Sequence, residues 1–149
     1  MAAFDMFADN PVLGVGQGNF PWRIMEYEDR EGYHGRFHGS RPAHSIYFTL
    51  LPELGIIGTV IFFLLVKKNF ATIRRVRRYA RDEFKHVNTE QAQYYDNIGL
   101  GLMGAFVGYF FSGIFLSVLY YPHFWVFLAL PLALEKSMLK QEALGGHEN

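Results

Sequence analysis

Two long apolar stretches constrain this chain more than any other feature of its sequence. Residues 46–66 contain one charged residue, Glu53, and residues 97–119 contain none. A helix needs about 20 consecutive apolar residues to cross the hydrocarbon core of a bilayer, and both stretches are long enough. In lipid, helices satisfy their own backbone hydrogen bonds. The sequence therefore predicts an all-α polytopic membrane protein, with transmembrane helices over residues 46–66 and 98–119.

A third apolar segment, residues 124–134, is too short to span a bilayer comfortably. The turn before it and the residues after it lengthen it enough to cross. We expect a short third transmembrane helix over residues 120–140, with a re-entrant helix as the alternative. Residues 141–149 then form a cytoplasmic tail.

The distribution of charge predicts the orientation. Residues 67–85, which follow the first stretch, carry eight basic side chains against Asp82 and Glu83: Lys67, Lys68, Arg74, Arg75, Arg77, Arg78, Arg81 and Lys85. A basic run flanked by membrane spans is typical of the cytoplasmic side and indicates this topology more strongly than nucleic-acid binding. Residues 67–97 are thus a predicted cytoplasmic loop, and residues 1–45 are a predicted loop segment on the opposite side of the membrane. The chain has no cysteine, which excludes a disulfide framework and a thiolate site.

The N-terminal region begins with a predicted short interfacial or packed helix, ended by Asn10-Pro11. The glycines of GVGQGNF, residues 14–20, are similar to a phosphate cradle. Asn19 stands where the dinucleotide fingerprint needs a third glycine, and no strand precedes the segment. We therefore expect a tight turn in which glycine supplies unusual backbone angles. Asp5 and Asp9 argue against a signal peptide, and we expect Met1 to lie inside a longer protein.

The ionisable side chains before the first apolar stretch are the candidate functional residues. His44-Ser45 lies at its mouth, and Arg23, Arg36 and Arg41 precede it. Histidine exchanges protons near neutral pH, and arginine binds phosphate through two parallel hydrogen bonds. This combination suits chemistry on a lipid-linked phosphate or pyrophosphate, or a transporter vestibule. Glu53 either lines a cavity or reaches the interface.

Two further patterns favour structural roles. His34 and His38 have the spacing of two metal ligands on a helix, but Gly35 and Gly39 disfavour a helix there, so we predict no metal site. In the second apolar stretch Gly104, Gly108 and Ser112 recur every fourth residue. Small residues at this spacing predict a face on which another helix packs.

The sequence resembles the O-antigen ligase and O-antigen polymerase superfamily. His44-Ser45, nine further residues and then Gly55-Ile-Ile-Gly58-Thr59 meet the family pattern of His, then Asn, Ser or Gln, nine residues, and Gly-x-x-Gly-Thr. NPVLGVGQGNF resembles the loop segment of the family. AHSIYF and GIFLSVLYYPHFW resemble the branch associated with exosortase A systems.

The resemblance implies the C-terminal part of a multi-span glycosyltransferase of the GT-C type. Such a ligase moves a glycan from undecaprenyl pyrophosphate to a lipid or protein acceptor, at the periplasmic face of the inner membrane, without a nucleotide sugar or essential metal. His44 is then the catalytic candidate. Arg41, Arg36, Ser45 and Glu53 are candidates for substrate binding, and N-terminal helices or a partner subunit would complete the enzyme.

Three alternatives remain open from the sequence. Two belong to the same superfamily, namely a polysaccharide polymerase and a protein O-oligosaccharyltransferase. The third is a non-enzymatic membrane scaffold of a polysaccharide export system, which would depend on Gly104 and Gly108 rather than on His44.

Overall fold

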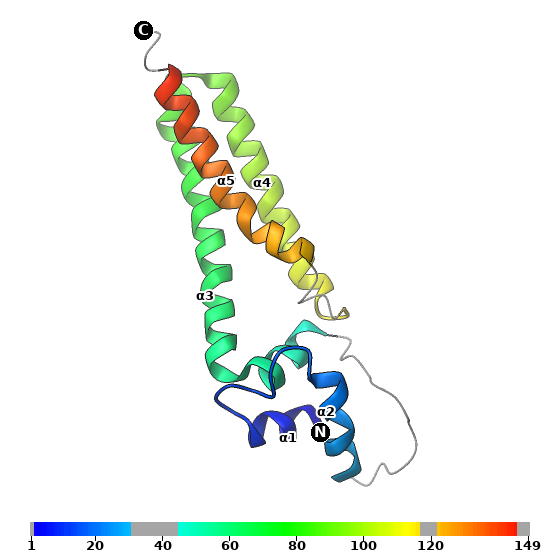
Figure 1. Cartoon of the computed structure of the whole chain (residues 1–149). Coiled ribbons are helices and arrows are strands. Elements are labelled where there is room, and N and C mark those ends of the chain that lie inside the picture. The colour runs from blue at the N-terminus through cyan, green and yellow to red at the C-terminus, as the bar shows by residue number, and fades with distance from the viewer. Residues whose placement is uncertain (1, 31–44, 117–121, 146–149) are drawn as a thin grey trace. The chain divides into compact units, whose positions relative to one another are not determined.

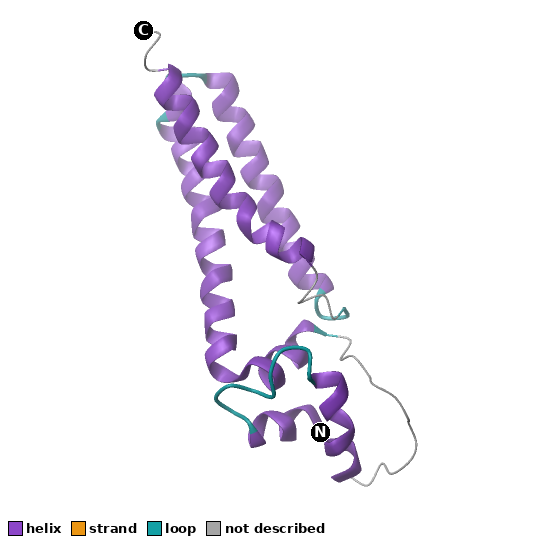
Figure 2. Ribbon diagram, viewed as in Figure 1, coloured by secondary structure: helices purple, strands orange, loops and turns teal. Residues whose placement is uncertain are grey.

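The computed structural model describes residues 2–30, 45–116 and 122–145. All regular secondary structure in these residues is helical (Figures 1 and 2), as the sequence predicts. The elements are α1 (Ala2–Asp9), α2 (Phe20–Arg30), α3 (Ile46–Asp82), the 3-10 helix η1 (Phe84–His86), α4 (Thr89–Ser112) and α5 (Pro122–Gly145).

The chain divides into two compact units. The first comprises Met1–Leu64 and Phe111–Tyr120, and the second comprises Leu65–Phe110 and Tyr121–Asn149. Helices α3 and α4 each contribute to both units.

Unit 1 contains α1, α2 and the beginning of α3. Helix α1 ends where Asn10-Pro11 predicts, and the Asn10 side chain donates to the carbonyl of Met6. The core of this part of unit 1 is a cluster of buried side chains from α1 and α2: Met6, Phe20, Ile24 and Tyr27. Helix α2 lies in the segment that the sequence analysis treated as a loop, because Gly32, Gly35 and Gly39 dominate the composition that follows it.

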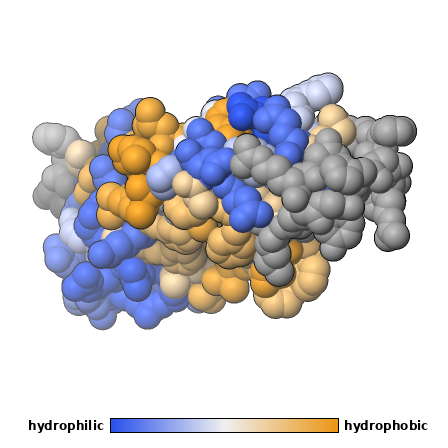
Figure 3. All heavy atoms as spheres, turned by 90° about the horizontal axis from the view of Figure 1, so that it is seen from below, coloured by the Kyte–Doolittle hydropathy of each residue, from blue (hydrophilic) through white to orange (hydrophobic). Residues whose placement is uncertain are grey.

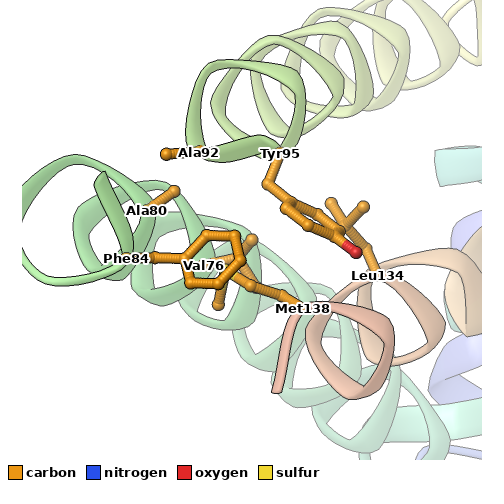
Figure 4. Packing of buried hydrophobic residues seen from close by; sticks show 7 residues of the cluster. All are labelled: Val76, Ala80, Phe84, Ala92, Tyr95, Leu134 and Met138. Carbon is orange, nitrogen blue, oxygen red and sulfur yellow. The ribbon is translucent and has the colours of Figure 1, made fainter. Parts of the chain in front are cut away.

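Unit 2 is held together by a core that joins α3, η1, α4 and α5. Its buried members are Val76, Ala80, Phe84, Ala92, Tyr95, Leu134 and Met138 (Figure 4). The rings of Phe84 and Tyr95 meet edge to face at 5.8 Å, and the Tyr95 hydroxyl lies 3.0 Å from the Ser137 hydroxyl. Helix α4 starts at Thr89, nine residues before the predicted span, because the Asn88 side chain accepts a hydrogen bond from the Gln91 N–H.

The glycine that brings helices together in unit 2 is Gly99 rather than those of the predicted packing face. A Cβ added at Gly99 would lie 2.6 Å from Cγ of Arg77. Around Gly104 and Gly108, an added Cβ would meet no described atom within 4 Å. Their role in packing against further helices remains a prediction.

One stretch among the described residues, Ile46–His86, is long and apolar enough to cross a membrane. Helix α4 continues the predicted second span only to Ser112, and α5 is one uninterrupted helix that passes through Pro131. The three predicted spans thus correspond to three long helices. Crossing of the membrane by α4 and α5 stays a prediction.

Asp96 links α4 to the basic part of α3. Arg77 Nε and Arg81 Nη2 both donate to Asp96 Oδ1, at 2.8 and 3.0 Å. Burial raises the pKa of Asp96, but the hydrogen bonds from Arg81 and Arg77 outweigh it and hold this pKa below its ordinary value.

We therefore expect Asp96→Asn to destabilise the protein at pH 7 by about 1 kcal/mol, because two charged hydrogen bonds are weakened. The lowered pKa means that this contribution is present above the ordinary Asp pKa of about 3.9 and is lost as the pH falls below it. Thermal unfolding of both proteins in detergent between pH 3 and pH 7 checks this. Asp82→Asn, at an exposed carboxylate, is the control. If the stability difference between Asp96→Asn and the unchanged protein were the same at pH 3 as at pH 7, the lowered pKa of Asp96 would be contradicted.

Candidate functional site

The described residues include only part of the predicted site. His44, Arg36 and Arg41 lie outside them, as do His34 and His38. Ser45 and Glu53 are described, and they lie at opposite ends of residues 46–54, the first part of α3, which we call the half-helix.

The N-terminal end of the half-helix is anchored inside unit 1. Ser45 is 5% exposed, and its carbonyl accepts a hydrogen bond from the Thr49 hydroxyl at 2.9 Å. The Ile46 N–H donates to the carbonyl of Gly113 at 2.8 Å. The residue that follows His44 therefore has a fixed, buried position.

The C-terminal end of the half-helix is a break in α3. Gly55 has φ 60° and ψ −168°, which is not helical, and α3 changes direction there (Figure 1). In an uninterrupted helix, the N–H groups of Ile56 and Ile57 would bind the carbonyls of Pro52 and Glu53. The break leaves these four groups without their usual partners. The break lies three residues after Pro52, the proline inside α3.

Residues 10–19, which join α1 to α2 and which we call the glycine loop, supply the missing acceptors. The Ile56 N–H donates to the carbonyl of Pro11 at 2.9 Å. The Ile57 N–H donates to the carbonyl of Val12 at 3.3 Å.

The same loop also supplies the missing donors. The Val15 N–H binds the carbonyl of Pro52 at 2.8 Å, and the Gly16 N–H binds the carbonyl of Glu53 at 3.0 Å. The glycine loop thus replaces one turn of helical hydrogen bonds with bonds to another segment of the chain.

This insertion requires glycine on both sides. Gly14 and Gly55 have φ values of 69° and 60°, in the region that favours glycine. A Cβ on Gly14 would lie 2.4 Å from the carbonyl of Glu53, and one on Gly55 would lie 2.4 Å from the carbonyl oxygen of Val12. The two backbones meet without room for a side chain.

The second glycine of the motif also belongs to this break. A Cβ on Gly58 would lie 2.6 Å from Cβ of Leu54, on the other side of Gly55. Thr59 is partly exposed, and its buried hydroxyl oxygen has no partner among the described residues. The Gly-x-x-Gly part of the motif is therefore explained by backbone geometry.

The side chain of Glu53 completes the joint. It is 1% exposed, Oε2 accepts from the Gly18 N–H at 3.0 Å and Oε1 accepts from the Phe20 N–H at 2.9 Å. Phe20 begins α2, so the carboxylate satisfies N–H groups at a helix N-terminus, where negative charge is stabilising. The structure therefore gives Glu53 a structural role, and its predicted contact with substrate stays a prediction.

These contacts settle how the glycine loop is used. The N–H groups of Val15, Gly16 and Gly18, which would be needed to hold a phosphate, all bind groups of Pro52 or Glu53. The expectation of a tight turn is confirmed by positive φ at Gly14, Gly16 and Gly18. Sequence reasoning missed the link between the loop and the half-helix, although the lone carboxylate in an apolar stretch was a signal for it.

A series of alanine substitutions separates the two reasons for glycine. Gly18 has φ 76° but open space at its Cβ position, so Gly18→Ala should cost about 1–2 kcal/mol of stability. Gly14→Ala and Gly55→Ala add a clash with the backbone of the other segment and should lower the free energy of unfolding by substantially more. Gly104→Ala, with neither restriction, is the control. Thermal unfolding of the four variants checks the order, and equal losses at Gly14 and Gly18 would refute the close contact.

Glu53→Gln replaces one accepting oxygen by an NH₂ group, which leaves a buried N–H of the joint without an acceptor. We expect a loss of about 1–3 kcal/mol in the free energy of unfolding. Glu26→Gln, at an exposed ion pair with Arg23, is the matched control and should change stability by less than about 1 kcal/mol. Unchanged stability of Glu53→Gln, together with a raised KM for a lipid-linked glycan, would instead support substrate contact.

Comparison with known families matches the part of the chain that contains the joint. Residues 1–63 match the sequence model of the family described as O-Antigen ligase (Wzy_C), a segment that contains the glycine loop, the half-helix and Gly-x-x-Gly-Thr. No curated protein and no solved structure matches the chain. The match and the apolar α3 together indicate a membrane protein. The match over these N-terminal 63 residues supports a relation of the chain to the O-antigen ligase superfamily.

Proposed function

We propose that this protein acts in the transfer of a glycan from undecaprenyl pyrophosphate to an acceptor at the periplasmic face of the bacterial inner membrane. The observation that carries the proposal is the match of residues 1–63, which contain the complete pattern from His44-Ser45 to Gly55-x-x-Gly58-Thr59. Residues 1–45 then belong to the periplasmic side of the membrane, and the basic segment 67–97 belongs to the cytoplasmic side.

His44 is the proposed catalytic residue, either as the base that takes the proton of the acceptor hydroxyl or as a contact to the leaving pyrophosphate. Arg41 and Arg36 are proposed to bind the pyrophosphate, since guanidinium groups match phosphate oxygens in charge and geometry. No metal or nucleotide sugar is part of this proposal.

This assignment is supported by the way in which the described residues hold Ser45, the residue next to His44. Ser45 is buried, the half-helix that follows it is anchored at Gly113, and its other end is fixed by Glu53 and the glycine loop. A proton-transferring group must be held within hydrogen-bond distance of the proton that it moves. Anchoring both ends of the half-helix serves that requirement.

The polymerase and the protein O-oligosaccharyltransferase remain second candidates, because the family match fits them too. Identification of the glycosylated product distinguishes the three enzymes: a lipid core, a longer polymer or a protein. The scaffold alternative is favoured by one observation, the open space over Gly104 and Gly108, where a helix of another protein has room to pack.

In the complete protein, His44→Ala should reduce glycan transfer in membranes by a factor of about 100 or more, which is the contribution typical of a general base. Insertion of the variant into the membrane should stay normal. His86→Ala, an exposed histidine after α3, is the matched control and should retain transfer. Transfer is followed from a labelled lipid-linked glycan.

Full transfer by His44→Ala would overturn the catalytic assignment. If enlargement of Gly104 and Gly108 also abolished function in that case, the scaffold would be the better explanation.

A further inference from the structure

Unit 1 carries an apolar surface that the proposed reaction does not use. Helix α1 exposes Phe4, and the half-helix exposes Tyr47 and Phe48, at 57%, 38% and 55%. These helices line a small hollow of about 30 Å³, formed by Ala3, Phe4 and Phe7 from one side and Tyr47, Phe48 and Leu51 from the other. Asp5 and Asp9 lie on other positions of α1, so its apolar and acidic residues are separated.

This surface continues into the apolar part of α3. The glycine loop binds Ile56 and Ile57 through Pro11 and Val12, and the exposed side chains of Val12 and Leu13 therefore adjoin the start of that part. Beyond it α3 exposes apolar side chains in many directions, namely Ile56, Ile57, Val60, Ile61, Phe63 and Leu64. Figure 3 shows hydrophobic side chains lying beside one another on the face that it draws. A helix that is apolar all round is typical of a buried core or a membrane span.

The length of α3 after the break limits where the membrane lies. Residues 56–66, between Gly55 and Lys67, are eleven in number and rise about 16 Å, roughly half of a hydrocarbon core of about 30 Å. If the half-helix lay in water above the membrane, the apolar part of α3 would be too short. If the half-helix and α1 lie at the depth of the outer acyl chains, their apolar side chains cover the part of the hydrocarbon core that residues 56–66 do not span.

The hydrogen bonding of the break meets the condition for that depth. Non-helical backbone is tolerated in the hydrocarbon region only where the protein itself satisfies the polar groups. Pro52, Glu53, Ile56 and Ile57 all find such partners in the glycine loop, and the carboxylate of Glu53 is enclosed. In water this complete internal satisfaction would not be needed.

We propose that α1 and the half-helix form a membrane-inserted cap, whose surface of Phe4, Val12, Leu13, Tyr47 and Phe48 contacts the acyl chains of phospholipids in the outer leaflet. The break at Gly55 lies at hydrocarbon depth. This inference concerns the membrane contact and does not depend on glycan transfer.

Nitroxide labels on single cysteines test the cap in the full protein, reconstituted in bilayers of phosphatidylethanolamine and phosphatidylglycerol. These 149 residues contain no cysteine of their own. Phe4→Cys and Phe48→Cys are compared with Ile61→Cys, whose native side chain is similarly exposed at 53%, and with Gln17→Cys, an exposed polar position of the glycine loop. Similar exposure means that the comparison reports the surrounding medium.

For each label we compare the ratio of its accessibility to oxygen with its accessibility to a water-soluble nickel complex. We expect this ratio at Phe4 and Phe48 to be several-fold higher than at Gln17 and to approach the ratio at Ile61. Nickel accessibility equal to that at Gln17 would place the cap in water and overturn the proposal. Low accessibility to both reagents would show that protein covers this surface, which also overturns it. If Phe48→Cys fails to insert, Tyr47→Cys and Leu13→Cys test the same surface.

Discussion

The structure of unit 1 depends on one exchange of hydrogen bonds. A helix interrupted at a single residue leaves carbonyls on one side and N–H groups on the other without partners, and each such buried group costs about 1–3 kcal/mol if it stays unpaired. Here the glycine loop binds both sets, through Val15 and Gly16 on one side and Pro11 and Val12 on the other. The break is therefore a specific joint between distant segments, and removing the loop would leave the half-helix unsupported.

The carboxylate of Glu53 adds direction to this joint. Backbone exchange alone would fix the glycine loop against α3, but it would not fix where α2 begins. Because both oxygens of Glu53 bind N–H groups at the start of α2, the orientation of that helix is tied to the half-helix. A charge that is costly to bury is thus stabilised by backbone N–H groups at and just before the start of α2.

The sequence predicted the parts of this structure that depend on local chemistry, such as the helical class, the end of α1 at Asn10-Pro11 and the glycine turn. It did not predict α2 or the partners of Glu53, because both depend on contacts between residues about 35 positions apart. The break lies at Gly55 and not at Pro52, the residue that lacks an N–H. Only glycine accepts the positive φ and the close approach of Val12 there.

The joint also gives a physical reason for the spacing of the motif. The nine residues between Ser45 and Gly55 are the half-helix, which makes two and a half turns and rises about 13 Å. One residue more or fewer would rotate Ser45 by about 100° relative to the glycine loop. A fixed number of residues is required because the half-helix connects two anchored ends, the Gly113 contact and the Glu53 joint. Spacing and glycine positions are therefore consequences of the same geometry.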